Sequence, residues 1–460
     1  MEDAWKIEGK WRFPTTPESL ELYGTLIITP EHEMVLDIKD FIEDSEEIRK
    51  YRKMLSTEVV NGFSHDGKFI TLYQCLKKFD QVSSTGFITS SFYVGTALIG
   101  NYFDKKEKVS FKKISIAYNY LDRWLNISGI ELEENTVPYE SFKVRYEIPT
   151  PIEFYLKNGL KVRLEVQPKT IWKETSKREV CIKEEVFLVI EASEGLYLEE
   201  IKKYIFYFQN FFSFLISEPT YPAKIYGTAE KTSDPVEIVF NETVRRQEEG
   251  TFAVVPLYPY SHVNGKLKDI LDGWLEKSEE LETVYNLYFG TIYNSNIYLE
   301  HKFLNFIMAL EAYHRRKGRN EEVPQEEHRK RIEEILEASS KEYRKWLEEK
   351  LKYSNEPSLR KRLKEIYKSL VNVKYITQLI PDKKKFIEEI VATRNYFVHY
   401  DETLKSKALK GRDLLQAVHK LKIIIEVCLL KGIGFSDEEI DEALLNNWKY
   451  KQMLIEQSRN

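Results

Sequence analysis

Short runs of alternating apolar and polar residues dominate the first 260 residues of the chain. In residues 160–167 every second residue is Leu or Val, and this period of two indicates a strand with one solvated face. The preceding pair Asn158-Gly159 is a strong hairpin signal because both residues tolerate a positive φ. Strands are predicted near residues 24–29, 33–38, 68–75, 87–94, 152–156, 160–167 and 179–191.

One long helix interrupts this β-rich part, and helical patterns fill the rest of the chain. Between Leu198 and Ile216, apolar and mostly aromatic side chains recur at helical spacing, which indicates a core helix laid on a sheet, with a ligand groove as the alternative. Pro324, Pro357 and Pro381 fall between later patterns or at their starts, as expected of residues that punctuate helices. These patterns predict helices at residues 266–289, 297–317, 326–350, 357–371, 382–399, 411–431 and 437–457.

The order of these patterns predicts an α+β multidomain fold, with a β-rich N-terminal half followed by an all-α helical bundle. A chain of 460 residues is too long for a single core. The predicted segments are a β-rich domain at 1–140, a second β-rich subdomain with the long helix at 141–262, the bundle at 263–435 and a helical tail at 436–460.

Charge is distributed unevenly along the chain, although the formal net charge is only −5. Residues 311–460 carry 32 Lys and Arg against 26 Asp and Glu, a net charge of +6, whereas residues 1–310 carry a net charge of −11. A basic C-terminal part is compatible with a nucleic-acid partner. The acidic N-terminal part should repel RNA and is expected to sense or regulate.

Several common site types are absent from the sequence. The three cysteines lie far apart, the eight histidines occur singly, and no Gly-rich phosphate loop or HExxH zinc motif is present, so neither a metal nor another cofactor is expected. No run of 18 apolar residues occurs, and the acidic N-terminus lacks the apolar stretch of a secretory signal. A cytoplasmic location without membrane contact is therefore expected.

Two predicted helices each place a charged residue on an apolar face. Arg394 continues a stripe that begins at Ile387, and Glu311 continues one that begins at Leu304. A buried charge is costly unless it is paired, so Arg394 and Glu311 are expected to pair inside the bundle or to line one polar cavity. Such a pair adds little net stability, which favours a functional role, while a structural pair or a snorkelling Arg394 is the alternative.

His399 lies five residues after Arg394, so the two side chains point about 140° apart on a regular helix. Asn395 lies four residues before His399 and shares its face. Histidine exchanges protons near neutral pH and arginine matches phosphate geometry. This combination fits acid–base work on a phosphodiester.

The chain holds a second Arg–His spacing of this kind, between Arg412 and His419. Lys422 lies on the same edge of the predicted helix. These three residues are therefore expected to form a solvated rim.

The residues around Arg394 also carry a resemblance to a known family. Arg394-Asn395 followed by His399 resembles the RNxxxH signature of HEPN ribonuclease domains, residues 303–315 with Glu311 resemble the early HEPN helix that carries an acidic residue, and residues 358–363 fit the middle of such domains. The N-terminal part resembles the N-terminal domain of ApeA-like anti-phage proteins at Trp11, Phe13-Pro14, Gly24-Thr25-Leu26, Asn61-Gly62, Asp66-Gly67-Lys68 and Asp122-Arg123-Trp124.

The resemblance implies a HEPN-type bundle with metal-independent endoribonuclease activity that acts as a toxin in abortive infection. Host RNA, with tRNA the expected target, would be cleaved after an unknown phage trigger. The alternative is a non-catalytic HEPN module that binds RNA or a protein partner and regulates.

Under the favoured hypothesis, each candidate residue has a role. The 2′-OH of the RNA would attack the adjacent phosphorus and leave a cyclic phosphate, with His399 moving protons and Arg394 holding the phosphate. Asn395 and Glu311 would orient them. Tyr396 and Tyr400 are candidate RNA-binding residues because exposed aromatic rings can stack on unpaired bases. Because one helix does not aim both Arg394 and His399 at one phosphate, a homodimer with a composite site is expected.

Overall fold

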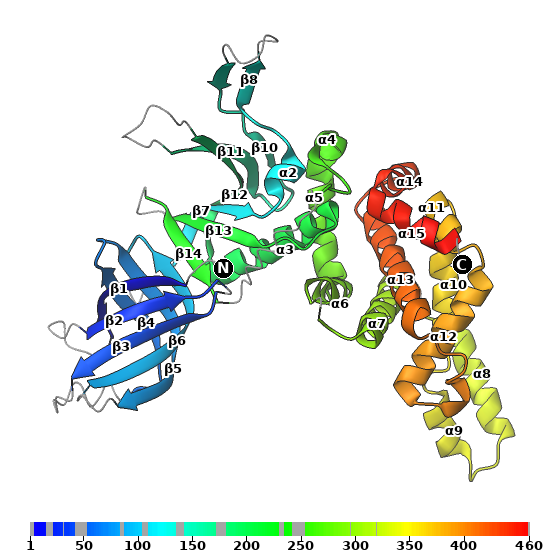
Figure 1. Cartoon of the computed structure of the whole chain (residues 1–460). Coiled ribbons are helices and arrows are strands. Elements are labelled where there is room, and N and C mark those ends of the chain that lie inside the picture. Colours follow the sequence, from blue (N-terminus) through cyan, green and yellow to red (C-terminus); the bar gives the residue numbers. More distant parts are fainter. Residues whose placement is uncertain are drawn as a thin grey trace. The chain divides into compact units, whose positions relative to one another are not determined.

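The described residues form two compact units, Met1–Lys268 and Asp269–Asn460. A computed structural model describes residues 4–14, 22–30, 32–41, 53–82, 87–103, 109–134, 142–171, 181–229, 234–241, 254–294, 296–318 and 320–458. The first unit is rich in strands and the second is helical, which confirms the predicted fold class (Figure 1).

The first six strands close into a barrel, drawn in blue in Figure 1. Their order is β6-β3-β2-β1-β4-β5, and β5 also pairs with β6. Inside lie the buried rings of Trp11, Phe13 and Phe92. A Cβ on Gly62 would stand 2.4 Å from the Trp11 ring, so glycine is needed there. The strands are β1 (Trp5–Arg12), β2 (Leu22–Ile28), β3 (Met34–Phe41), β4 (Ser56–Ser64), β5 (Phe69–Val82) and β6 (Phe87–Ile99).

Six further strands extend the same sheet from β6 in the order β14-β13-β7-β12-β11-β10, with antiparallel neighbours throughout. The predicted hairpin is confirmed, because Ile152 pairs with Leu164 and Gly159 has a φ of +86°. The strands are β7 (Ser110–Tyr118), β10 (Ile152–Tyr155), β11 (Lys161–Ile171), β12 (Cys181–Tyr197), β13 (Pro222–Ala229) and β14 (Val236–Phe240), and β8 (Ile130–Glu134) and β9 (Phe142–Tyr146) form a separate pair.

The predicted helix at residues 198–216 is α3 (Leu198–Ile216), and it packs on the extended sheet. Its aromatic stripe is buried, and the Tyr118 hydroxyl donates a hydrogen bond to the Ile205 carbonyl at 2.8 Å. The Phe212 ring contacts Trp124, whose indole N–H donates to the Tyr258 carbonyl at 2.7 Å. This packing confirms the core-helix interpretation. Two short helices, α2 (Leu121–Leu125) and α4 (Tyr260–Val263), complete this side of the unit.

The second unit is a bundle of helices of very different lengths (Figure 1). The longest, α13, places its apolar side in the core and packs along α7. The helices are α5 (Leu267–Glu280), α6 (Glu282–Tyr293), α7 (Leu299–Lys317), α8 (Gln325–Ala338), α9 (Arg344–Leu351), α10 (Leu359–Ser369), α11 (Lys374–Leu379), α12 (Lys383–His399), α13 (Gly411–Gly432), α14 (Asp437–Asn446) and α15 (Trp448–Ser458).

Three of the long predicted helices are each broken in two. The patterns predicted at 266–289, 326–350 and 437–457 contain breaks at Leu281, at residues 339–343 and at Asn447. Each break preserves the amphipathic period closely enough that hydrophobic spacing alone does not reveal it. The short helix α11 was not predicted.

The predicted tail belongs to the bundle. The Asp441 carboxylate in α14 accepts hydrogen bonds from the backbone N–H groups of Lys374 and Tyr375, both at 2.8 Å, at the start of α11. The Tyr375 hydroxyl donates to the Tyr450 carbonyl in α15 at 2.9 Å. In the first unit, strands from both predicted β-rich segments share one sheet, because β7 pairs with β12 and β13.

Candidate functional site at the end of helix α12

The C-terminal half of α12 carries four of the six candidate residues, and a fifth, Tyr400, directly follows the helix. Asp382 caps the helix by accepting the Lys385 N–H at 2.9 Å. The buried face continues through Ile390 to Thr393. Arg394 is only half-buried, so the prediction that it occupies a core position is wrong, because its neighbour Thr393 takes the inward position.

Arg394 is held by its neighbour on the helix. Its Nη1 donates a hydrogen bond to the Asn395 side-chain oxygen at 3.2 Å. Asn395 therefore orients the guanidinium group directly, whereas the sequence placed Asn395 with His399.

The expected pair between Arg394 and Glu311 does not form; among the described residues no hydrogen bond or ion pair joins them. Helices α7 and α12 meet where the rings of Phe303 and Phe397 lie 5.8 Å apart. Glu311 lies eight residues from Phe303, about 12 Å along the axis of α7. Arg394 lies only three residues from Phe397, about 4.5 Å along the axis of α12. The two charged side chains therefore lie at different heights along the α7–α12 interface. The apolar stripe of a single helix does not show how two helices are aligned, so the sequence did not reveal this offset.

The Glu311 carboxylate instead acts electrostatically on Arg362, a buried arginine of α10. Burial lowers the pKa of Arg362, the Arg315 charge adds to this, and the carboxylates of Glu311, Glu356 and Glu365 oppose it.

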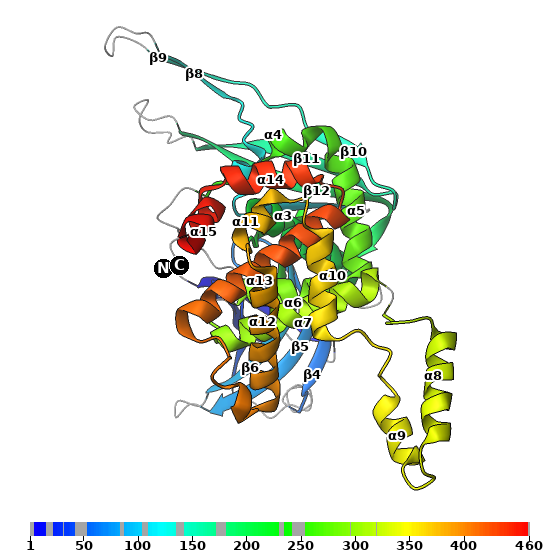
Figure 2. The ribbon, with the colours of Figure 1, turned by 90° about the vertical axis from the view of Figure 1, so that its right-hand side faces the viewer.

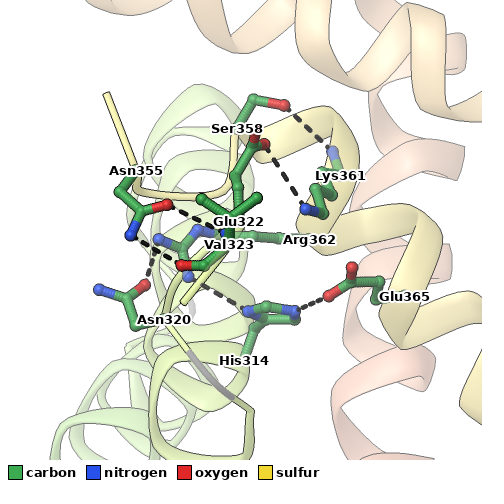
Figure 3. Close-up of polar contacts among 9 residues, drawn as sticks. All are labelled: His314, Asn320, Glu322, Val323, Asn355, Ser358, Lys361, Arg362 and Glu365. Atoms are coloured by element: carbon green, nitrogen blue, oxygen red, sulfur yellow. Dashed lines mark hydrogen bonds and ion pairs between the residues drawn. The ribbon is translucent and has the colours of Figure 1, made fainter. Parts of the chain in front are cut away.

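The hydrogen bonds of the Arg362 cluster define its geometry (Figure 3). Arg362 Nη1 donates to His314 Nδ1 at 3.2 Å and Nη2 donates to the Asn320 side-chain oxygen at 2.6 Å. Since Nδ1 accepts, the ring hydrogen of His314 lies on Nε2, which donates to Glu365 at 2.6 Å. The cluster joins α7 to α10.

His399 is the last residue of α12 and its side chain is exposed. Tyr400 follows in the left-handed region with a φ of +51°, and its N–H donates to the Tyr396 carbonyl at 2.8 Å. The Tyr396 and Tyr400 rings lie 6.4 Å apart; Tyr400 is 75% exposed, while Tyr396 is half-buried against Phe397.

The loop after Tyr400 is fastened beside α12. The Thr393 hydroxyl donates to the Glu389 carbonyl at 2.7 Å and accepts the Leu409 N–H at 2.9 Å. Asp401 accepts hydrogen bonds from the hydroxyl and the N–H of Thr403, which lower the pKa of Asp401, and the nearby His399 lowers it further.

This loop brings basic residues that the sequence analysis did not assign to the site. Lys407 and Lys410 in the loop and Arg412 at the start of α13 are exposed, and no ion pair within the described ranges engages them. Lys405 pairs with Glu402 at 2.9 Å. Four of the eight residues at 405–412 are basic, and this local density is the feature of the sequence that could have indicated them.

Two family models match the chain and together span both units. The model described as ApeA N-terminal domain 1 matches residues 6–274, more than half of the chain, and the model described as Apea-like HEPN matches residues 304–439. The chain belongs to the ApeA-like HEPN family. No curated protein and no solved structure matches it.

The HEPN match contains every candidate residue and the basic loop, since it runs from α7 into α14. HEPN domains in general are ribonucleases, and the ApeA-like family indicates an anti-phage effector. The C-terminal end of a helix carries partial negative charge, which disfavours a phosphate at His399. Arg394, Lys407, Lys410 and Arg412 carry charge of the opposite sign, and Lys407 and Lys410 lie on the loop that Leu409 ties to α12.

The described residues hold neither a metal-binding cluster nor a membrane-spanning helix. No three His, Cys, Asp or Glu side chains in those ranges are grouped so that they could hold a metal ion. Within the same ranges, no helix combines the length and the apolar character that crossing a membrane requires.

Proposed function

We propose that this chain is a metal-independent endoribonuclease that acts in the cytoplasm as a toxin and cleaves host RNA, with tRNA as the first target to test, in abortive infection. The observation that carries this proposal is the exposed His399 at the end of α12, beside the Asn395-held Arg394 and the basic loop. The β-rich unit would sense the phage trigger, which its acidic balance favours because like charge repels RNA.

The chemistry needs only proton transfer and charge stabilisation. The RNA 2′-oxygen forms a bond to phosphorus as its proton is removed, and the bond to the 5′-oxygen breaks as that oxygen receives a proton. The products are a cyclic phosphate and a 5′-hydroxyl group. His399 exchanges one of these protons and Arg394 stabilises the charge on the phosphoryl oxygens.

The remaining candidates support this step. Asn395 holds Arg394 through the observed hydrogen bond. Tyr400 and Tyr396 would stack on unpaired bases next to the cleaved bond. Glu311 is assigned a positioning role through the Arg362 cluster, because it acts on Arg362.

The test compares full-length wild type with His399→Ala and Arg394→Ala on total tRNA in excess EDTA. Loss of a general acid–base or charge-stabilising group should lower the rate by about 10²–10⁴-fold. His301→Ala, which removes an exposed histidine of α7, is the matched control and should retain the wild-type rate. A 2′-deoxynucleotide at the cleaved position should block cleavage, because DNA lacks the attacking hydroxyl.

Equal cleavage by His399→Ala would contradict the assignment. If wild type binds RNA but leaves it intact, and His399→Ala binds equally well, the chain is the non-catalytic module instead.

A further inference from the structure

Helices α8 and α9 form a hairpin, here called the arm (residues 325–351), that stands off from the other helices of its unit (Figure 2). The two helices pack on each other through half-buried aliphatic residues, yet neither contains a single buried residue. A helix pair with so little core contributes little to the fold. Its surface is therefore available for binding.

Exposed aromatic residues form a stripe along α9 and just beyond its two ends. Tyr343, the residue before the helix, is followed by Trp346 and Lys350 at spacings of three and four residues, which places these three on one helical face, and Tyr353 lies two residues after the helix ends. Tyr343 and Trp346 are each 57% exposed and Tyr353 is 65% exposed. Exposed rings of this size on one face mark a binding surface.

The charges of the arm are divided between its helices. In α8, Arg329 and Arg331 are both engaged by glutamates of the same helix. Residues 341–353 carry five Lys and Arg against three Glu. The lysines of that segment have no ion pair in the part of the chain that the structure describes, and Lys352 Nζ lies 5.4 Å from the Tyr353 ring centroid.

The arm is held firmly at its neck, residues 320–323 and 355–362 (Figure 3). The Asn355 side chain accepts the Val323 N–H at 3.1 Å and donates to the Val323 carbonyl at 3.0 Å, and Glu322 N–H donates to the Asn355 carbonyl at 2.7 Å. Buried Arg362 adds the hydrogen bond to Asn320 at 2.6 Å. The neck therefore fixes where the arm leaves the bundle.

The neck also connects the arm to the helix of the candidate site. Arg360 in α10 forms an ion pair of 3.6 Å with Glu388 in α12. Glu388 lies eleven residues before His399, about 16 Å along the helix. The ion pair therefore places the neck, from which the arm extends, about three turns of α12 away from His399.

We propose that the α9 face of the arm is a second RNA-binding surface, which grips an unpaired segment of the substrate away from the cleaved bond. Tyr343 and Trp346 stack on bases, and Lys350 contacts a phosphate, which is how proteins bind single strands without reading sequence. The inference rests on the proposed function, because RNA is the substrate proposed there. A surface with excess positive charge favours RNA over a neutral protein partner.

The test measures binding rather than cleavage. Full-length His399→Ala is titrated into a fluorescently labelled, unstructured 20-nucleotide RNA, and anisotropy gives the Kd. Adding Tyr343→Ala and Trp346→Ala should weaken binding about tenfold or more. Adding Ile335→Ala, which removes a 44% exposed apolar side chain from α8, should change the Kd less than about twofold.

Salt dependence tests the lysine separately. Lys350→Glu should make the slope of log K against log salt less steep by about 0.7, the value for one lost phosphate contact. All variants should keep the far-UV circular dichroism of the parent, since no residue of α9 is buried.

An unchanged Kd and salt slope in the arm variants would overturn the proposal. If those variants leave RNA affinity intact but shift the sedimentation of the chain from dimer to monomer, the stripe is a protein contact and the RNA assignment is wrong. Cleavage by the His399→Ala parent would refute the catalytic assignment alone, because the binding result does not depend on it.

Discussion

Thr393 connects the core of the bundle to the candidate site. Its side chain is fully buried and its hydroxyl accepts the Leu409 N–H while donating to the Glu389 carbonyl. The loop that carries Lys407 and Lys410 is thereby tied to α12 one residue before Arg394. Only the hydroxyl group of Thr393 accepts this N–H, so a substitution that removes the hydroxyl alone tests its contribution.

Thr393→Val keeps the shape but leaves the Leu409 N–H without its partner. The free energy of unfolding should fall by about 1–3 kcal/mol, because a buried N–H without an acceptor loses its hydrogen bonds to water and gains none in return. RNA cleavage should fall as well. Urea denaturation and cleavage assays measure both. Thr377→Val is the control: its hydroxyl donates to a carbonyl of its own helix, and a change within about 0.5 kcal/mol is expected. Equal costs would show that the Leu409 bond is unimportant.

Glu311 and Arg394 should act independently. Residues that touch couple in a double-mutant cycle, whereas residues without shared partners add within about 0.3–0.5 kcal/mol. No hydrogen bond or ion pair joins these two described residues. The changes in unfolding free energy caused by Glu311→Ala and by Arg394→Ala should therefore sum to the change in the double mutant. A coupling energy above about 1 kcal/mol would restore the pair predicted from the sequence.

His419 gives the bundle a specific response to acid. The sequence predicted a solvated rim, whereas His419 is half-buried, and burial, followed by the Lys422 charge, lowers its pKa below 6.5. The unfolded chain therefore binds the proton more readily than the folded chain. Stability is full above pH 6.5 and falls as the pH drops through that value toward the lower folded-state pKa.

His419→Gln should flatten this acid response. The difference in Tm between pH 7 and about pH 5 should shrink relative to wild type, because a residue without a titrating ring cannot take up the proton. His301→Gln, at an exposed position of α7, should keep the wild-type difference. An identical pH profile for His419→Gln would contradict the assignment.

At the scale of elements, the sequence predicts what local patterns encode. The Asn158-Gly159 hairpin and α3 were predicted because turn chemistry and a nineteen-residue aromatic stripe are local signals. The barrel was not, because closure through the β5–β6 pairing depends on contacts between strands. The breaks near Leu281 and Asn447 leave the amphipathic period almost intact and were missed for that reason.

The candidate site shows the same limit. The sequence placed His399 at a helix end and predicted an exposed Tyr400, and both hold. Tyr396 was also predicted to be exposed, but it is half-buried because its ring packs on Phe397. The partner of Arg394 was not predicted, since registry between α7 and α12 is set by packing at Phe303 and Phe397. The basic loop needed the Thr393 bond to place it beside α12, and no spacing rule in the sequence expresses that bond.

Helix α10 should depend on Arg362 more than on any exposed neighbour. Arg362→Ala removes the hydrogen-bond donors to His314 and Asn320. The free energy of unfolding should fall by about 2–3 kcal/mol, because these acceptors are left without a partner. Arg360→Ala breaks only a solvent-exposed ion pair and should cost at most about 1 kcal/mol. Chemical denaturation compares the two, and similar losses would mean that the buried cluster contributes nothing beyond a surface pair.

For the whole molecule, the positions of Arg394 and His399 on α12 predict a site shared between two copies. Arg394→Ala and His399→Ala chains, each inactive alone, should regain about a quarter of wild-type cleavage when unfolded and refolded together in equal amounts. Half of the dimers formed would be mixed, and each would hold one intact groove of two. Cleavage that stays at the level of the parents would mean that each chain carries its own complete site.

The neck of the arm has a consequence for how this protein can change over generations or by design. The chain enters and leaves the arm at adjacent points, Val323 and Asn355, so residues 324–354 can be exchanged for another segment while the ends stay in place. Closing a short loop there costs little entropy. A different hairpin grafted at this junction would change the surface that the arm presents, while the helices that carry Arg394 and His399 keep their sequence.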